Sequence, residues 1–278
     1  MDQGIEFLKG HGTENDFVVL PDPAGTLELT PSRVRALCDR HGGLGADGVL
    51  RVVLGALVPD APPGTAAGEW FMDYRTADGS FAEMCGNGVR VFACYLAEAG
   101  LVAAPEFRIG SRFGPHTVRR HDDGSVTVEM GPVRCAGTST VTVGGTAFSG
   151  LVVDVGNPHL ACVTEVPVDQ LDLTVPPGHD PGTFPHGVNV EFVNVRPSGT
   201  LHMRVHERGV GETRSCGTGA VAALAAALAA QDLDSGEADI QVPGGWLHVA
   251  IEDGDSTLTG PAVLVAHGRL APDWWSAH

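Results

Sequence analysis

Residues 216–231 read CGTGAVAALAAALAAQ, and they set the expected fold because every residue from 220 to 230 is apolar. A helix that is hydrophobic on all faces has to be buried on all sides. A second Cys-Gly-x-Gly turn stands earlier in the chain, at Cys85, and leads into VRVFACYLAEAG, which ends at Gly100 in a position that favours helix termination. Each helix is therefore expected to be enclosed by a curved sheet, in two strand-rich halves that look like a duplication.

The strand prediction rests on runs rich in Val, Ile and aromatic residues that are separated by Gly, Pro and Asp clusters. These runs begin at Phe17, Gly48, Trp70, Ser125, Leu151, Val188, Leu201 and Leu247. The segment DIQVPGGWLHVAI predicts a hairpin that turns at residues 243–245. One further, amphipathic helix is predicted after Thr30, which precedes a proline at the first helical position. Its buried face would carry Val34, Leu37 and Cys38.

Composition narrows the classes of partner. The chain has 278 residues, with 17 Lys and Arg against 34 Asp and Glu, for a formal charge of -17. Such a surface repels a nucleic acid backbone and an anionic membrane, so no nucleic acid and no membrane partner is expected. The longest apolar run is about half the length needed to span a bilayer. We see no secretory signal, and six cysteines without a CxxC pair favour a cytoplasmic chain with reduced thiols.

The chemistry begins with a cysteine at the start of a helix. Backbone N–H groups there lack partners within the helix and carry the positive end of its dipole, so they bind anions and favour a thiolate. Glycines after the cysteine let the backbone approach a ligand closely. Two such sites facing each other, at Cys85 and Cys216, would suit inversion of a carbon that loses a proton on one face and gains one on the other.

Other interpretations of the two cysteines compete with this one. A single Cys-Gly-x-Gly turn is weak evidence, because an unpaired cysteine is more often a small buried hydrophobic residue. A disulfide between Cys85 and Cys216 is the main chemical alternative. A zinc site is disfavoured because the two cysteines lack local partner ligands, so no metal is expected. Nothing in the sequence specifically supports a cysteine protease.

The chain as a whole resembles the diaminopimelate epimerase family, whose members interconvert LL- and meso-diaminopimelate without pyridoxal phosphate, in lysine and peptidoglycan biosynthesis. The resemblance runs nearly end to end through eight blocks in one order. These are KGHGTENDFVVL from Lys9, DRHGGLGADGVLRV from Asp39, DYRTADGSFAEMCGNGVRVFA from Asp73, GNPHLACV from Gly156, GVNVEFV from Gly187, RVHERGVGETRSCGTGAVAA from Arg204, PGGWL from Pro243 and LTGPAVLV from Leu258.

The resemblance implies an α+β fold of two pseudo-symmetric halves, each a β-barrel-like sheet wrapped around a central apolar helix. The N-terminal half would comprise residues 1–128, carrying Cys85, together with a return segment at 261–278. The C-terminal half would comprise residues 129–260, carrying Cys216. The family also implies an isomerase without a cofactor, which acts on a small amino-acid substrate, and a homodimer.

The resemblance further implies roles for individual residues. Cys85 and Cys216 would be the catalytic acid and base. The expected substrate-binding residues are Asn15, Thr76, Gly86, Asn87, Asn157, His159, Asn189, Glu207, Arg208, Gly217 and Thr218. Glu207 would accept from a substrate ammonium, and Arg208 would pair with a carboxylate. The amides that follow each cysteine would hold the carboxylate at the reacting centre.

Two positions depart from the family pattern. Thr76 stands where many members have an Asn that is expected to bind the distal amino acid group of diaminopimelate, and Gly48 stands where some members have Gln. Losing one hydrogen bond at Thr76 would cost about 0.5 to 1.5 kcal/mol. Three hypotheses follow: a diaminopimelate epimerase, a related cofactor-independent racemase or epimerase of another amino acid, and a non-catalytic or redox protein in which the two cysteines mainly form a disulfide.

Overall fold

The computed structural model describes residues 4–82 and 84–278 and divides the chain into two compact units. The first unit comprises residues 1–128 and 261–278, and the second comprises residues 129–260. Residues 1–3 and 83, which the expected N-terminal half includes, lie outside the described residues. The mixed α+β class is confirmed: strands dominate, and the described residues form four α-helices. They are α1 (Pro31–Cys38), α2 (Gly86–Glu98), α3 (Gly217–Ala229) and α4 (Pro272–Ser276).

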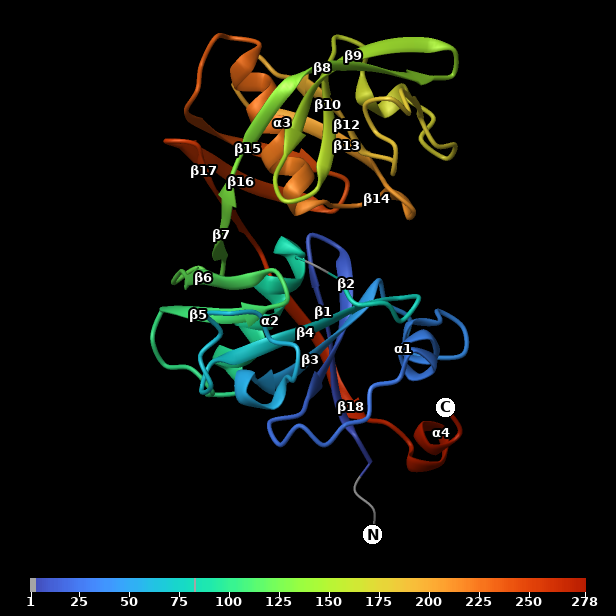
Figure 1. Cartoon of the computed structure of the whole chain (residues 1–278), viewed down its shortest axis with the longest axis vertical. Helices are drawn as coiled ribbons and strands as arrows, with labels where there is room; N and C mark the ends of the chain where they lie inside the picture. Colours follow the sequence, from blue (N-terminus) through green and yellow to red (C-terminus); the bar gives the residue numbers. More distant parts are fainter. Residues whose placement is uncertain (1–3, 83) are drawn as a thin grey trace. The chain divides into compact units, whose positions relative to one another are not determined.

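The sheet of the first unit contains strands from both ends of the chain (Figure 1). Its strands are β1 (Glu6–Gly12), β2 (Asn15–Pro21), β3 (Gly48–Leu54), β4 (Trp70–Thr76), β5 (Glu106–Ser111), β6 (Gly114–Arg120) and β18 (Val263–Arg269), and β7 (Val126–Pro132) begins in this unit. They pair in the order β18-β1-β2-β3-β4-β5-β6-β7. Two of these pairs, β2–β3 and β4–β5, are parallel, and the others are antiparallel.

The sheet of the second unit repeats this pattern of orientations. Its strands are β8 (Arg134–Val143), β9 (Thr146–Asp154), β10 (Pro158–Val163), β11 (Gly178–His179), β12 (Asn189–Val195), β13 (Leu201–Glu207), β14 (Gly211–Thr213), β15 (Gly236–Val242), β16 (Gly245–Glu252) and β17 (Asp255–Gly260). The order is β8-β9-β10-β12-β13-β15-β16-β17, in which β10–β12 and β13–β15 are parallel. The parallel pairs occupy the same places as in the first unit, and each central helix connects the second parallel pair.

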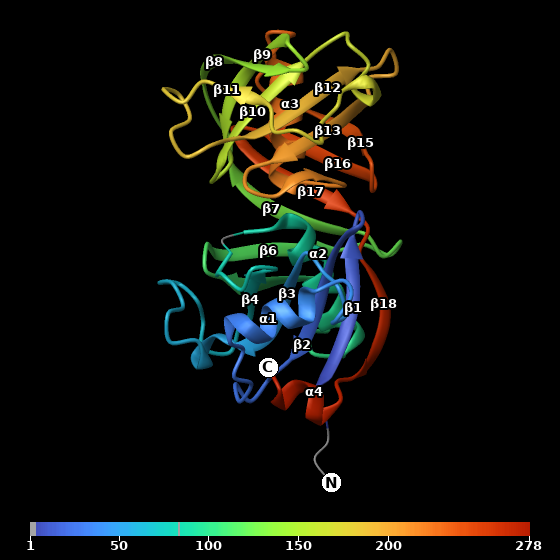
Figure 2. The same ribbon diagram turned by 90° about the vertical axis from the view of Figure 1, so that its right-hand side faces the viewer.

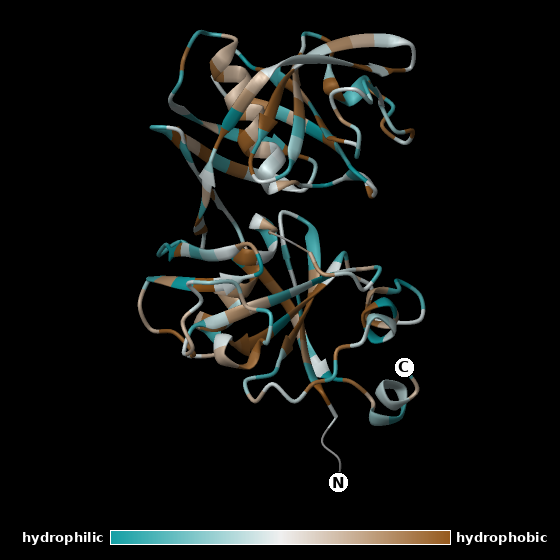
Figure 3. Ribbon diagram, in the orientation of Figure 1, coloured by the Kyte–Doolittle hydropathy of each residue, from teal (hydrophilic) through white to brown (hydrophobic). Residues whose placement is uncertain are grey.

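Each central helix packs inside the sheet of its own unit. Helix α2 contacts β1, β2, β3, β6 and β18, whereas α3 contacts β9, β10, β12, β13, β15, β16 and β17 (Figure 2). In α3 every residue except Thr218 and Ala229 is buried, and apolar colours run along most of this helix in Figure 3. The all-apolar sequence of α3 is therefore explained by the strands around it.

Several local predictions are confirmed. Thr30 caps α1 by accepting a hydrogen bond from the Arg33 amide at 3.2 Å, and Val34, Leu37 and Cys38 are its buried residues. Gly100 follows α2 with a φ of +69°, the left-handed conformation that terminates helices. Val242 pairs with Gly245, which leaves a two-residue turn between β15 and β16.

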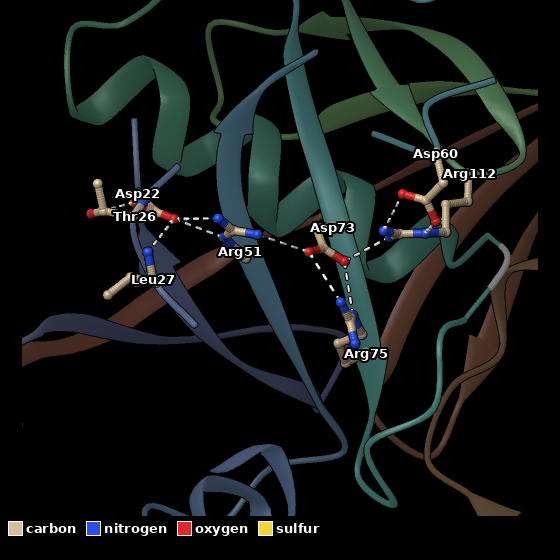
Figure 4. Close-up of polar contacts among 8 residues, drawn as sticks. All are labelled: Asp22, Thr26, Leu27, Arg51, Asp60, Asp73, Arg75 and Arg112. Atoms are coloured by element: carbon tan, nitrogen blue, oxygen red, sulfur yellow. Dashed lines mark hydrogen bonds and ion pairs between the residues drawn. The ribbon is translucent and has the colours of Figure 1, made fainter. Parts of the chain in front are cut away.

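A chain of ion pairs crosses β3 and β4 in the first unit (Figure 4). At its centre is Asp73, whose side chain is 2% exposed and contacts three arginines. Its carboxylate accepts from Arg112 Nη1 at 2.6 Å, from Arg75 Nε at 2.9 Å and from Arg51 Nη1 at 3.5 Å. Burial opposes ionisation of Asp73, but the neighbouring Arg75 and Arg112 outweigh it and lower the pKa of the carboxyl. The network thus links β4, the strand that precedes the Cys85 turn, to residues of β3 and of the segment after β5.

Candidate active site

Cys85 is the N-cap residue of α2 and has extended backbone geometry. Its sulfur accepts a hydrogen bond from the Gly88 amide at 3.4 Å, so the first turn of the helix donates to the sulfur as expected from the sequence. The thiol also donates a hydrogen bond to Asn15 Oδ1, at a distance of 3.5 Å from the sulfur. The side chain of Cys85 is half-buried. Helix start and sulfur thus form one local unit that favours negative charge on the sulfur.

Asn15 connects the Cys85 turn to the first hairpin. Its Oδ1 accepts from Asn87 Nδ2 at 3.2 Å as well as from Cys85, and its own Nδ2 donates to Asp47 Oδ2 at 2.7 Å. Asn87 is 1% exposed. The structure therefore brings together Asn15, Cys85, Gly86 and Asn87. Both ends of the Asn15 amide are thus engaged with protein atoms, and its predicted contact with substrate stays a prediction.

Arg90 is a residue of this site that the sequence interpretation missed. Its side chain is 0% exposed, and burial lowers its pKa to about 10, while the nearby Cys85 opposes that shift. Nη2 donates to Thr13 Oγ1 at 3.1 Å, and Nε donates to the Pro261 carbonyl at 3.3 Å. The Arg90 guanidinium is thus a buried cation near Cys85.

Cys216 is the N-cap residue of α3, but its surroundings differ from those of Cys85. It is 6% exposed, and burial raises the pKa of its thiol well above the ordinary value. The carboxylates of Glu207 and Glu191 raise this pKa further, while the Thr218 hydroxyl, 3.5 Å from the sulfur, and the Gly219 amide oppose the shift. Cys216 is therefore held as a thiol.

Glu207 ends β13 next to this cysteine. Burial raises the pKa of the Glu207 carboxyl, and hydrogen bonds from Thr213 and Cys216 partly offset this effect. The Thr213 hydroxyl donates to Glu207 Oε1 from the short strand β14, which pairs with β13. Glu207 is thus both a hydrogen-bond acceptor for the Cys216 thiol and a negative charge beside it.

The Asn-Pro-His segment and Asn189 lie on neighbouring strands of the same unit. His159 pairs with Asn189 in the parallel register of β10 and β12. Asn189 Nδ2 donates to the Pro158 carbonyl at 3.1 Å, and its Oδ1 accepts from the Arg208 amide at 2.9 Å. The Arg208 side chain is exposed. Asn189 therefore holds the backbone at Pro158, directly after Asn157, and at Arg208, directly after Glu207. The Arg208 guanidinium remains at the surface of its unit.

His159 itself is fully buried. Its Nε2 lies 2.9 Å from Asn157 Oδ1, and its Nδ1 lies 2.7 Å from Glu191 Oε1. Both ring nitrogens are thus engaged by protein groups. The direct substrate contact expected of His159 stays a prediction.

The two departures from the family pattern, Gly48 and Thr76, are direct partners in the β3–β4 register. A Cβ atom at Gly48 would lie 2.6 Å from the Arg75 carbonyl oxygen and 2.6 Å from Tyr74 Cε2, so no side chain fits there. The Thr76 hydroxyl is 2.6 Å from Asp78 Oδ1 and 2.6 Å from Ser80 Oγ. Its one proton is donated to Asp78, which leaves Thr76 without a donor for a ligand.

Gly219 has a role other than the one expected from the sequence. A Cβ atom there would lie 2.7 Å from Glu191 Oε1. The second glycine of the CGTG turn therefore makes room for a buried carboxylate beneath the helix start. Glu191 stands between Val190 and Phe192, and Arg90 stands between Val89 and Val91. A charged residue between two apolar ones is the signal that would have found them.

No disulfide joins any of the six cysteines, all of which belong to the described residues. Among residues 4–82 and 84–278, no group of three His, Cys, Asp or Glu side chains is arranged to hold a metal ion. No helix in the described part of the chain has the length and apolar character needed to cross a membrane.

Comparison with known structures gives the fold. A phenazine biosynthesis protein of the PhzF family from Bacillus anthracis superposes with a TM-score of 0.69 at 14% identity, covering 97% of this chain and 99% of that one. A hydroxyproline epimerase from Agrobacterium vitis superposes with a TM-score of 0.67 at 18% identity, covering 98% and 94%. The chain thus has the two-domain fold shared by these proteins.

Comparison of sequences gives the family. The model of the family described as "Diaminopimelate epimerase" matches residues 7–136 and 151–265. The diaminopimelate epimerases of Rhodococcus jostii and Rhodococcus opacus are 57% and 58% identical over 286 residues, covering 98% of this chain and 99% of each relative. That of Mycolicibacterium smegmatis is 54% identical, covering 98% of each chain. The chain belongs to the diaminopimelate epimerase family.

Proposed function

We propose that the chain epimerises LL-diaminopimelate to meso-diaminopimelate, as its family does, and that Cys85 and Cys216 are the acid–base pair of the reaction. The observation that carries this proposal is that each cysteine caps the start of the central helix of its unit. One sulfur removes the Cα proton as a thiolate, and the other delivers a proton from its thiol to the opposite face. After one turnover the two roles are exchanged, so the reverse reaction uses the same pair.

The surroundings of the two sulfurs favour opposite starting states. Cys85 has a buried cation nearby, Arg90, and a helix amide at its sulfur. Cys216 has two carboxylates nearby, and its pKa is raised well above the ordinary value. We assign the thiolate of the resting enzyme to Cys85 and the thiol to Cys216, because a cation favours the thiolate and an anion disfavours it.

Substrate is held by groups at the two helix starts and at the ends of nearby strands. The amides of Gly86, Asn87, Gly217 and Thr218 are placed to stabilise charge that develops on the reacting carboxylate. Arg208 has an exposed guanidinium suited to a second carboxylate, and Glu207 is an acceptor for an ammonium group. Asn157 binds substrate with its side-chain amide, while Asn15, His159 and Asn189 position their neighbours. Thr76 contributes at most an acceptor oxygen.

The identical series of strand orientations supports two pseudo-symmetric, barrel-like halves that arose by duplication. The reaction needs no cofactor, because the acid and base are both side chains. The family resemblance supports a homodimer and a cytoplasmic location as proposals, and sedimentation of the purified chain tests the dimer.

Replacing each cysteine tests the assignment. Cys85→Ala and Cys216→Ala should each lower kcat by about a hundredfold to ten-thousandfold, the usual contribution of a positioned acid or base. Cys135, an exposed cysteine on β8, gives a matched control, since Cys135→Ala should leave kcat unchanged. Full activity in either of the first two variants would refute the proposed pair.

A further inference from the structure

Glu191 is a fully buried carboxylate beneath the Cys216 turn. It lies on β12 with 0% exposure, and its Oε1 is 2.7 Å from Nδ1 of His159, which is also 0% exposed. The carboxylate reaches the start of α3, where it occupies the space that a side chain at Gly219 would need. A fully buried acidic residue between Val190 and Phe192 requires an explanation that the family chemistry does not supply.

Burial of this carboxylate requires a compensating proton donor. Glu191 Oε2 has no hydrogen-bond partner within the described part of the chain, so the contact of Oε1 with His159 is its compensation. Leaving a buried charge uncompensated is costly. Since a carboxylate oxygen only accepts, His159 Nδ1 carries a proton and donates it to Glu191.

The other ring nitrogen of His159 acts on the proposed substrate-binding residue. Nε2 lies 2.9 Å from Asn157 Oδ1, and an amide oxygen also only accepts. When both ring nitrogens of His159 carry protons, Nε2 donates as well, and the Asn157 amide is held by its oxygen. Its NH2 group then remains to donate to a ligand, since Asn157 is half-buried at the end of the loop before β10.

We propose that Glu191 is a positioning residue for substrate binding, which acts through His159 to make Asn157 present its NH2 group as a hydrogen-bond donor to a carboxylate of the substrate. The inference rests on the proposed substrate contact of Asn157. The Glu191–His159 pair fixes the orientation of the Asn157 amide, so that its oxygen faces His159 and its nitrogen faces the ligand. Without the pair, the amide would offer its oxygen as readily as its nitrogen.

Other titratable groups face Glu191 from the elements packed around it. Cys162 and His159 lie on β10, Glu207 lies on β13, and Cys216 lies at the start of α3. Among these groups the histidine alone is able to carry a positive charge. Changes in Glu191 therefore also alter the thiol of Cys216, and a test has to separate binding through Asn157 from that effect.

A double-mutant cycle separates the effect of Glu191 on binding through Asn157 from its effect on the Cys216 thiol. Glu191→Gln should raise KM for LL-diaminopimelate about tenfold, because a charged hydrogen-bond partner of His159 is lost. In an Asn157→Ala background the same substitution should raise KM less than about twofold, since the residue through which Glu191 acts is gone. Glu252→Gln, at an exposed position at the end of β16, is the matched control and should leave KM unchanged.

The outcomes distinguish this inference from the proposed function. If Asn157→Ala leaves KM unchanged, the substrate contact of Asn157 is wrong. If Asn157→Ala raises KM but Glu191→Gln does not, or does so equally in both backgrounds, the contact stands and the positioning role of Glu191 is overturned. Nitrogen-15 NMR of the wild-type ring gives a measurement that needs no variant to fold. Protons on both His159 nitrogens support the inference, and a proton on only one of them overturns it.

Discussion

The buried guanidinium of Arg90 donates from Nη2 to the hydroxyl oxygen of Thr13 at 3.1 Å. Thr13 and the next residue, Glu14, form the turn between β1 and β2 with φ values of +49° and +62°, a conformation that is uncommon for residues other than glycine. Asn15, which follows directly, accepts from the Cys85 thiol. Arg90 therefore stabilises an unfavourable turn that positions Asn15, a contact of Cys85.

Replacing the acceptor of this hydrogen bond should destabilise the protein. Thr13→Val keeps the branched shape but removes the hydroxyl, which should lower the free energy of unfolding by about 1 to 3 kcal/mol. Thr13→Ser keeps the acceptor and should cost less. Urea unfolding measures both variants. Equal stability of Thr13→Val and wild type would show that the hydroxyl does not matter to the turn.

The central carboxylate of the ion-pair network should matter far more than its outer one. Asp73→Asn leaves Arg51, Arg75 and Arg112 without the carboxylate they share, and should lower the free energy of unfolding by about 3 to 5 kcal/mol. Asp60, whose side chain is 56% exposed, pairs with Arg112 at 3.1 Å and provides the matched control. Asp60→Asn should cost at most about 1 kcal/mol, and comparable losses in the two variants would contradict this description.

Substrate binding should be weaker with Thr76 than with the Asn that many family members have at this position. Because the threonine proton is donated to Asp78, Thr76→Asn should add a donor and lower KM for LL-diaminopimelate by about two- to tenfold. Steady-state kinetics of the two proteins, with kcat compared in parallel, measures this effect. An unchanged or raised KM would mean that position 76 does not reach the substrate here.

The pKa of Cys216 should fall when a neighbouring carboxylate is neutralised. Glu207 raises this pKa because a nearby anion disfavours the thiolate, so Glu207→Gln should shift the alkylation profile of Cys216 to lower pH. The rate of iodoacetamide reaction against pH, followed by mass spectrometry in a Cys85→Ala background, reports the thiolate.

Glu212 offers the control for that experiment. It is exposed and paired with Arg204 at 2.7 Å, so Glu212→Gln should leave the profile of Cys216 where it is. A profile that stays in place in Glu207→Gln, or moves to higher pH, would show that Glu207 does not act on the cysteine through its charge.

The elements that the sequence predicts well are those whose signals are local. The cap at Thr30, the glycine after α2 and the apolar run of α3 are each readable within one turn or one helix. By contrast β1, EFLKGHG, is not recognisable as a strand because it contains two glycines. The structure gives their reason: a Cβ atom at Gly10 would lie 3.0 Å from Val91 of α2, and one at Gly12 would lie 2.9 Å from Arg90. Close packing of the helix is a tertiary requirement that the strand sequence alone does not reveal.

In the site, too, local sequence signals are predictable and tertiary contacts are not. The cysteine turns are visible from the sequence, and the family resemblance supplies Asn157, Asn189 and Glu207. Glu191 and Arg90 are missed because their role depends on partners 32 and 77 positions away along the chain. Only the fold shows that Arg90 lies near the Cys85 turn and that Glu191 lies near the Cys216 turn.

The direct test of the central claim is the fate of hydrogen at the inverted carbon. LL-diaminopimelate is incubated with the reduced enzyme in deuterium oxide, and substrate and product are analysed by mass spectrometry at low conversion. With one sulfur on each face, meso product should carry one solvent deuterium while recovered LL substrate carries none, because the abstracted proton stays on the first thiol. Product that retains its original hydrogen, or equal early exchange into substrate, would contradict a reaction that uses Cys85 and Cys216 on opposite faces.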